Sequence, residues 1–282
     1  MVVRVEQPKW TIQKVSDEGT QTAFIARLFL GVGNLRDLVA SNPDEKDKFD
    51  SLYEVVLTSL RSARKAAEEI ARLWQQHSSK VTSGEVARLE RQTLRIDESI
   101  DDALGKEVVS FVTAAGRAIK EGMRRFVASH ADIGFLFQKQ AKFETGLLTL
   151  DQMDSAFADY LRQTRAWSEP LQECRNAIEH KGWTLPRTTY VRQGNKIEAV
   201  PPLISGQPVT EFVPFMLDRI LCFVEELTAY YIQRLLPELM TLTEIPPADR
   251  AEEAPVRFQV TVANGGLPPW RISYHHDKFE DV

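Results

Sequence analysis

The segment from Arg175 to His180 places four chemically active side chains within six positions. Arg175 supplies a permanent cation that can hold a phosphate bidentately, and His180 supplies an imidazole that can move a proton near neutral pH. Asn176 adds a carboxamide and Glu179 a carboxylate. RNA cleavage without a metal needs a base for the 2′-hydroxyl, an acid for the leaving oxygen and positive charge at the phosphorane. These residue types suit that reaction.

The spacing of Arg175 and His180 limits how they can act together. At about 100° per residue, their side chains point about 140° apart on a continuous helix. They converge if the helix distorts before Gly182 or if two copies of the chain meet. A catalytic site therefore needs both residues exposed in a shared cleft. The structural alternative has Arg175 engaged by Glu179 one turn away and His180 isolated at the helix end, where the dipole favours a cation.

Basic residues gather around this segment although the chain is acidic overall. The formal net charge is −5, whereas residues 160–196 contain seven Lys and Arg against three Glu, a local charge of +4. Such a patch suits a phosphate backbone. Trp183 is an aromatic residue that can stack on a base or serve packing, and the same two interpretations hold for Tyr190. The candidate RNA-binding residues are Lys181, Arg187, Tyr190 and Arg192.

The composition narrows the class of protein. With 282 residues, of which 43% are hydrophobic, the chain can bury a full core. Its two cysteines, Cys174 and Cys222, are expected to be reduced core residues. No Gly-rich phosphate loop, His-Glu-x-x-His motif or Cys pair at zinc spacing is present, so we expect neither a cofactor nor a metal. The N-terminal residues lack the apolar core of a signal peptide, and no uncharged stretch approaches the roughly 20 residues of a bilayer span. This predicts a cytoplasmic protein without membrane contact.

Hydrophobic spacing of three and four residues predicts a mainly α-helical, up-and-down bundle. A bent first helix is expected at 24–39 and a long amphipathic helix at 49–74. The pattern over 89–126 predicts one extended helix, or two joined near Gly105.

The segment with Arg175 and His180 is expected to lie in the next helix. The capping-box sequence at 149–152 opens this helix, and Gly182 ends it. Pro170 marks a kink, or a new start capped by Ser168.

A β-hairpin insertion is expected before the last long helix. Thr189–Gln193 and Lys196–Val200 flank Gly194-Asn195, a turn sequence, within an insertion at 187–201. The following helix, at about 210–236, is apolar around most of its circumference. It therefore buries two faces, either in the bundle centre or against a second subunit.

The last residues are expected to form a short β-rich extension. From residue 244 the chain becomes rich in Pro and acidic residues, and it then alternates from Val256 to Val262 as a strand does. A short extended segment is also expected at the N-terminus, where Val3 and Val5 alternate with polar residues, and it is a candidate partner for this strand. The predicted domains are thus 1–243, with the motif region at 150–240, and 244–282.

The run Arg-Asn-x-x-Glu-His at 175–180, followed by Gly182, resembles the signature of the HEPN superfamily. That signature is Arg-x4-6-His, and the residue directly after the Arg is commonly Asn, Asp or His. Asn176 stands at that place. The predicted layout over about residues 45–240 is also similar to the HEPN helical bundle. In active members, the motif residues of two subunits form one metal-independent RNA-cleaving site at a dimer interface. Other members bind RNA or nucleotides without cleaving them.

The resemblance implies a metal-independent endoribonuclease, a candidate toxin or defence component. Arg175 would hold the scissile phosphate and His180 would act as acid and base, with Asn176 at the phosphate and Glu179 positioning either residue. The expected partners are RNA, a second copy of the chain in a homodimer, and an inhibitory protein. The alternative prediction is a non-catalytic helical RNA- or protein-binding regulatory module.

Overall fold

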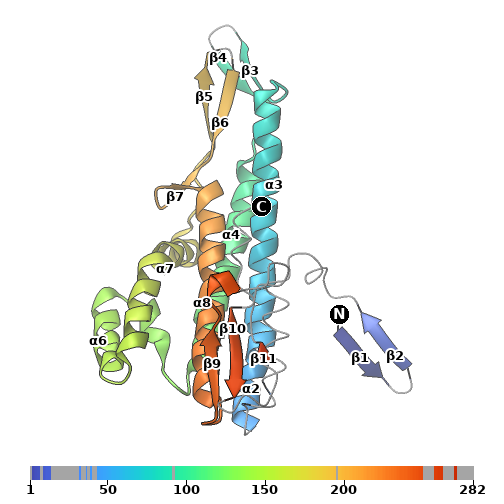
Figure 1. Cartoon of the computed structure of the whole chain (residues 1–282). Helices are drawn as coiled ribbons and strands as arrows, with labels where there is room; N and C mark the ends of the chain where they lie inside the picture. The colour runs from blue at the N-terminus through green and yellow to red at the C-terminus, as the bar shows by residue number, and fades with distance from the viewer. Residues whose placement is uncertain are drawn as a thin grey trace. The chain divides into compact units, whose positions relative to one another are not determined.

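The computed structural model describes residues 2–6, 9–13, 32, 36, 39, 43–90, 93–194, 196–249, 257–262 and 270–271. The chain forms two compact units, one made of Met1–Phe49 with Thr228–Val282 and the other of Asp50–Leu227. The second unit holds the segment from Arg175 to His180. The fold is mainly α-helical with small antiparallel strand pairs, which confirms the predicted class (Figure 1).

Most of the helices belong to Asp50–Leu227. In chain order the elements here are the end of α2 (Pro43–Ser51), the π-helical turn η1 (Leu52–Leu57), α3 (Thr58–Thr82), β3 (Ala87–Glu90), β4 (Thr93–Ile96), α4 (Asp101–Arg117), the π-helical turn η2 (Ala118–Met123), α5 (Arg124–Val127), the 3₁₀ turn η3 (Ile133–Phe137), α6 (Gln140–Asp151), α7 (Ser155–Lys181), β5 (Thr189–Gln193), β6 (Lys196–Val200), β7 (Leu203–Ile204), β8 (Gln207–Pro208) and the greater part of α8 (Val209–Leu235).

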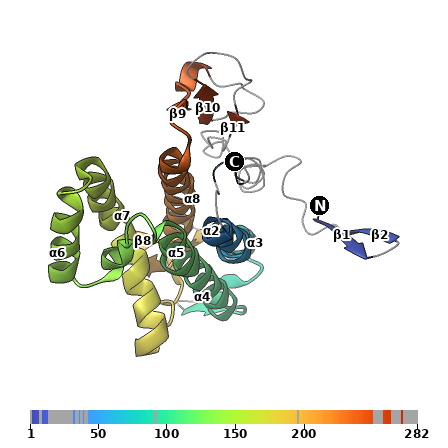
Figure 2. The ribbon, with the colours of Figure 1, turned by 90° about the horizontal axis from the view of Figure 1, so that it is seen from below.

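The long helices α3 and α4 lie side by side (Figures 1 and 2). The apolar stripe predicted over 49–74 is buried along η1 and α3, as Leu60 and Ile70 show with exposures of 0% and 2%. The two π-helical turns pack against each other. A Cβ at Gly122 of η2 would overlap the Val56 side chain of η1, so the glycine permits this close approach.

The helical pattern predicted over 89–126 begins later than expected. Leu89 and Ile96 lie in the antiparallel hairpin β3–β4, whereas α4 begins at Asp101 and continues through Gly105 without a break. The prediction was wrong at its start because the spacing of Leu89 and Ile96 fits two turns of a helix as well as two strands of a hairpin.

The start of α7 also differs from the prediction. The capping-box sequence 149–152 does not open this helix, because Thr149 lies inside α6, where its hydroxyl donates to the Thr145 carbonyl at 3.1 Å. The N-cap of α7 is Asp154, whose carboxylate accepts the Phe157 N–H at 2.9 Å. A threonine hydroxyl can bond to a helical carbonyl one turn back as well as cap a helix, so the sequence pattern was ambiguous.

Helix α7 then continues through Pro170 to Lys181. Ser168, expected as the cap of a new start, is instead buried within the helix and accepts a hydrogen bond from Gln172 at 3.3 Å. Gly182 follows with a φ of 61°, the left-handed conformation that favours glycine. The predicted end of the helix is therefore confirmed.

The predicted insertion hairpin is present with the predicted strand limits. β5 and β6 pair antiparallel from Thr189 with Val200 to Gln193 with Lys196, and Asn195 of the turn lies outside the described residues. The hairpin packs with β3–β4 at the end of α3. The small core there consists of Val81, Val86, Ala87 and Ile197, with Leu94, Ile96, Tyr190 and Ala199 partly buried around it.

The last long helix is confirmed as α8, and its predicted burial on more than one face is found within the chain itself. Phe223 is 1% exposed. Tyr160 of α7 stacks on it with ring centroids 6.3 Å apart, and Trp167 meets it edge-on at 6.2 Å. The buried hydrophobic residues of α8 in this unit are Val209, Phe212, Val213, Met216, Ile220, Leu221, Phe223, Val224 and Leu227.

The first unit contains small sheets. Its strands are β1 (Val2–Glu6) and β2 (Lys9–Gln13), which pair antiparallel, and β9 (Met240–Glu244), β10 (Phe258–Val262) and β11 (Trp270–Arg271), with the 3₁₀ turn η4 at Pro247–Asp249. The predicted C-terminal β structure is present in these last strands.

The pairing of the C-terminal strands differs from the prediction. β10 pairs with β9 and β11 and not with the N-terminal strand, because β1 finds its partner in the adjacent β2. β9 spans the predicted domain boundary between residues 243 and 244. The bent helix predicted at 24–39 lies outside the described residues, apart from Val32, Arg36 and Val39, which are helical.

Candidate functional site

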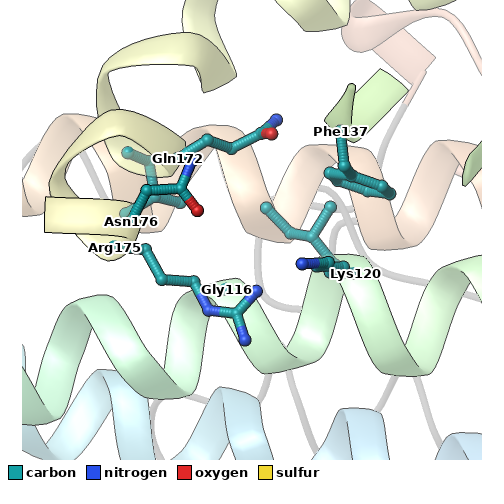
Figure 3. Close-up of a pocket in the computed structure, with 8 residues that line it drawn as sticks. Gly116, Lys120, Phe137, Gln172, Arg175 and Asn176 are labelled. Carbon is teal, nitrogen blue, oxygen red and sulfur yellow. The ribbon is translucent and has the colours of Figure 1, made fainter. Parts of the chain in front are cut away.

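Arg175 reaches from α7 toward α4, as Figure 3 shows. Its side chain is only 13% exposed. The guanidinium Nη2 lies 2.8 Å from Oε1 of Glu179 and 3.8 Å from Oε1 of Glu121 in η2. A Cβ at Gly116 of α4 would overlap Cδ of Arg175, so the glycine makes room for the arginine. Arg175 is thus a largely buried cation between two carboxylates.

Glu179 connects Arg175 with His180. Its Oε1 faces the guanidinium, and its Oε2 lies 3.8 Å from Nε2 of His180. The helix directs Arg175 and His180 to different sides. Glu179 lies one turn after Arg175 and directly before His180, so its carboxylate can reach both side chains. His180 itself is 72% exposed. The two motif residues share this anionic group, but neither the small cavity nor the wider groove beside this end of α7 is lined by both. The shared cleft that a catalytic site was expected to need is therefore not formed among the described residues of one copy of the chain. The ion pair of Arg175 with Glu179 is the one expected for the structural alternative.

The small cavity lies beside Arg175, between α4, η2, η3 and α7 (Figure 3). Its volume of about 20 Å³ has room for a water molecule and not for a nucleotide. The Nε of Arg175 is buried without a hydrogen-bond partner in the described part of the chain. The lining residues are Gly116, Ile119, Lys120, Phe137, Leu171, Gln172, Arg175 and Asn176.

The wider groove opens on the neighbouring side of α7, against the turn between β7 and β8. Its volume is about 460 Å³. Cys174 lies at its wall, and burial raises the pKa of this thiol to about 11, so the thiol stays protonated and unreactive at neutral pH. The residues that line the groove are Glu173, Cys174, Asn176, Ala177, Lys181, Trp183, Leu203, Ile204 and Ser205.

The candidate RNA-binding residues divide into two groups. Lys181 and Arg187 are exposed near the end of α7, and neither has a carboxylate partner among the described residues. Tyr190 and Arg192 lie instead on β5. The Tyr190 hydroxyl is 2.9 Å from Nε2 of His77, and Arg192 donates from Nε to the carbonyl of Gly194 at 2.7 Å. Tyr190 thus serves the packing of the hairpin, the alternative left open from sequence.

The local positive charge is smaller than the sequence window indicated. Arg162 pairs with Asp159, which lies just outside that window, and Arg165 pairs with Glu169 at 2.8 Å. Arg175 has its own carboxylates. The cations of the window without a carboxylate partner in the described part of the chain are Lys181, Arg187, Arg192 and Lys196.

The pair of Arg175 and Glu179 has a counterpart earlier in α7. Arg165 and Glu169 have the same spacing, the same distance of 2.8 Å and an arginine of the same 13% exposure. Both arginines also have a buried Nε without a partner among the described residues. The pairs differ in the next residue of the chain, which is His180 after Glu179 and Pro170 after Glu169. They also differ in the second partner of the arginine, because Arg165 donates to the Leu136 carbonyl at 2.7 Å whereas Arg175 faces Glu121.

Sequence reasoning missed the residues that α4 and η2 contribute. Glu121 is the second carboxylate at Arg175, Gly116 gives the arginine its space, and Lys120 lines the small cavity. Only Gly116 gave a local signal, since a glycine inside a helical pattern often marks a close contact.

Comparisons with known proteins identify no relative. No family model matches the chain, and neither the curated proteins nor the solved structures contain a match. Among the described helices, none combines the length and the apolar character needed to cross a membrane.

Proposed function

We propose that this protein is a HEPN-type, metal-independent endoribonuclease whose site forms at the C-terminal end of α7. The position of the Glu179 carboxylate carries this proposal. An anion at that position lies 2.8 Å from the guanidinium of Arg175 and 3.8 Å from the imidazole of His180. A scissile phosphate that displaced the carboxylate would therefore meet the cation and the proton-transfer group together.

In the proposed reaction an imidazole accepts the proton of an RNA 2′-hydroxyl, whose oxygen then attacks the adjacent phosphorus. The bond between phosphorus and the 5′-oxygen breaks, a proton passes to that oxygen, and a 2′,3′-cyclic phosphate remains. One imidazole cannot be base and acid in the same step, so a homodimer would supply the second His180. The 72% exposure of His180 leaves it accessible to such a partner, and the exposed amide of Asn176 is available to the phosphate.

The cellular setting belongs to the same proposal. Cys174 is a free thiol, as a reducing compartment such as the cytoplasm maintains it. An RNA-cleaving protein there needs restraint, which suits a toxin or defence component that an inhibitory protein controls.

A second candidate function is a non-catalytic RNA- or protein-binding regulatory module. The burial of Arg175 favours it, because a guanidinium held between Glu121 and Glu179 braces α7 against η2. Arg175 and Glu179 would then stabilise the bundle, and His180 would only complement the helix dipole.

The test is cleavage of a mixed RNA pool in EDTA by the wild type, Arg175→Ala, His180→Ala and the control Arg165→Ala. The control removes an arginine of equal exposure from the same helix, together with an equivalent ion pair. Circular dichroism and light scattering establish that fold and oligomeric state are retained.

The proposal expects cyclic-phosphate ends from the wild type and from Arg165→Ala, and a loss of at least about a hundredfold in the other two variants. The ribonuclease proposal is wrong if the wild type leaves the RNA intact. It is also wrong if all three variants cut the RNA as fast as the wild type does. RNA binding without cleavage would then support the second candidate.

A further inference from the structure

The groove between α7 and the β7–β8 turn lies directly beside the motif. Three residue pairs, each one turn apart, follow one another around the end of the helix: Arg175 with Glu179, Asn176 with His180, and Ala177 with Lys181. The first pair holds the buried ion pair, and the third lines the groove. Asn176 lines both the groove and the small cavity beside Arg175.

The groove has the size of a small-molecule site. Its volume of about 460 Å³ falls within the roughly 300–1,000 Å³ typical of ligand pockets, whereas the cavity at Arg175 holds about 20 Å³. A ligand that reaches the motif can therefore extend into the groove and not into the cavity.

The residues of the groove match the parts of a nucleotide. Trp183 is half-buried and offers an indole on which a base can stack. Asn176 can both donate and accept hydrogen bonds at a base edge, and Lys181 can pair with a phosphate. Lys181 is exposed and has no carboxylate partner within the described ranges.

The opposite wall is formed by a tight turn. Ser205 has a φ of 49° and is the only residue other than glycine with positive φ among the described residues. Its hydroxyl and the carboxylate of Glu173 are further hydrogen-bonding groups at the groove. Aromatic, amide, hydroxyl, carboxylate and cationic groups thus converge on one space at the end of α7 that carries His180.

We propose that this groove binds one nucleotide of single-stranded RNA, next to the phosphate that contacts the motif. The base stacks on Trp183, Asn176 reads its edge, and Lys181 holds the flanking phosphate. This inference rests on the proposed function for the identity of the ligand, but it concerns binding and not cleavage.

The experiment measures binding of a fluorescent 2′-O-methyl oligoribonucleotide, which lacks the attacking hydroxyl and cannot be cut. Fluorescence anisotropy compares the wild type with Trp183→Leu, Trp183→Phe, Lys181→Ala and the control Trp74→Leu, in which another half-buried tryptophan on α3 is replaced. Thermal unfolding confirms that each variant is folded.

Trp183→Leu is expected to bind about tenfold more weakly, because the base loses the aromatic ring on which it stacks, and Trp183→Phe is expected to retain most of the affinity. Trp74→Leu is expected to bind as the wild type does. Lys181→Ala is expected to weaken binding and to reduce its salt dependence. Loss of affinity in Trp183→Leu supports the inference even if the wild type never cleaves RNA. Equal affinity of Trp183→Leu and wild type overturns it even if cleavage is observed, and so does an absence of binding by the wild type.

Discussion

The largely buried Arg175 forms an ion pair with the more exposed Glu179 across one turn of α7, with Nη2 and Oε1 2.8 Å apart. Glu179 thus neutralises the guanidinium of Arg175, which is the cation that a bound phosphate would contact. Under the proposed function, RNA would compete with Glu179 for the guanidinium, and the strength of this competition can be measured.

Glu179→Gln is expected to raise the affinity for a 2′-O-methyl oligoribonucleotide about fivefold. The neutral amide removes the competing charge, and an ion pair of this kind contributes up to about 1 kcal/mol, which corresponds to a factor of about five in affinity. Anisotropy titrations at one fixed salt concentration measure the change.

The matched control for this variant is Glu169→Gln. It changes the net charge by the same amount in the same helix and disrupts the equivalent pair with Arg165. If both variants strengthen binding equally, the effect is general electrostatics. If Glu179→Gln weakens binding, the carboxylate holds Arg175 in its binding position and does not compete with RNA.

Gly116→Ala is expected to dislodge the Arg175 side chain. The new methyl group would overlap Cδ of the arginine, and overpacking of a close contact typically destabilises a protein by about 1–3 kcal/mol, which exceeds the gain in helix propensity of at most about 1 kcal/mol. We therefore expect a lower free energy of unfolding in urea, together with a loss of any cleavage that depends on Arg175.

Gly105→Ala is the control for that substitution, on the same helix. A Cβ at Gly105 meets only the Leu185 Cβ, at an ordinary 3.7 Å. This variant is expected to be more stable than the wild type by about 0.5–1 kcal/mol, since alanine is the better helix former. Equal stability changes at both glycines would show that Gly116 has no special contact with Arg175.

The features predicted correctly from the sequence are those with local causes. The stop of α7 at Gly182 needs only a residue that accepts positive φ, and the hairpin at 189–200 needs only a turn sequence between two alternating segments. The amphipathic helices follow from their own periodicity. Where a local pattern had two physical solutions, as at Leu89 or Thr149, the tertiary structure selected the one that was not predicted.

The surroundings of Arg175 could not be predicted in the same way. Glu121 is far from Arg175 in sequence and meets it only because α7 packs across α4 and η2. The groove likewise depends on the β7–β8 turn lying against α7, which no spacing within either segment reveals. Sequence spacing predicted the pairing of Arg175 with Glu179, whereas the contact with Glu121 and the groove depend on packing between segments.

His77 links α3 to the insertion hairpin, and its burial predicts that the stability of the fold depends on pH. Its Nε2 lies 2.9 Å from the Tyr190 hydroxyl, and its side chain is buried. Burial lowers the pKa of His77 from its usual 6.5, and this outweighs the opposing effect of Glu98 and Asp101. The folded protein therefore binds this proton less readily than the unfolded chain does, so the stability is fully present above about pH 6.5 and is lost as the pH falls through the lowered pKa.

The free energy of unfolding is accordingly expected to fall more steeply between pH 7 and pH 5 in the wild type than in His77→Gln, which cannot titrate. Each unit by which the pKa is lowered corresponds to about 1.4 kcal/mol. Tyr190→Phe serves as the control, because it removes the hydroxyl, at a cost of about 1 kcal/mol, but keeps the titrating imidazole. Urea titrations at several pH values give these energies. A constant difference between wild type and His77→Gln across this range would show that His77 carries no pH dependence.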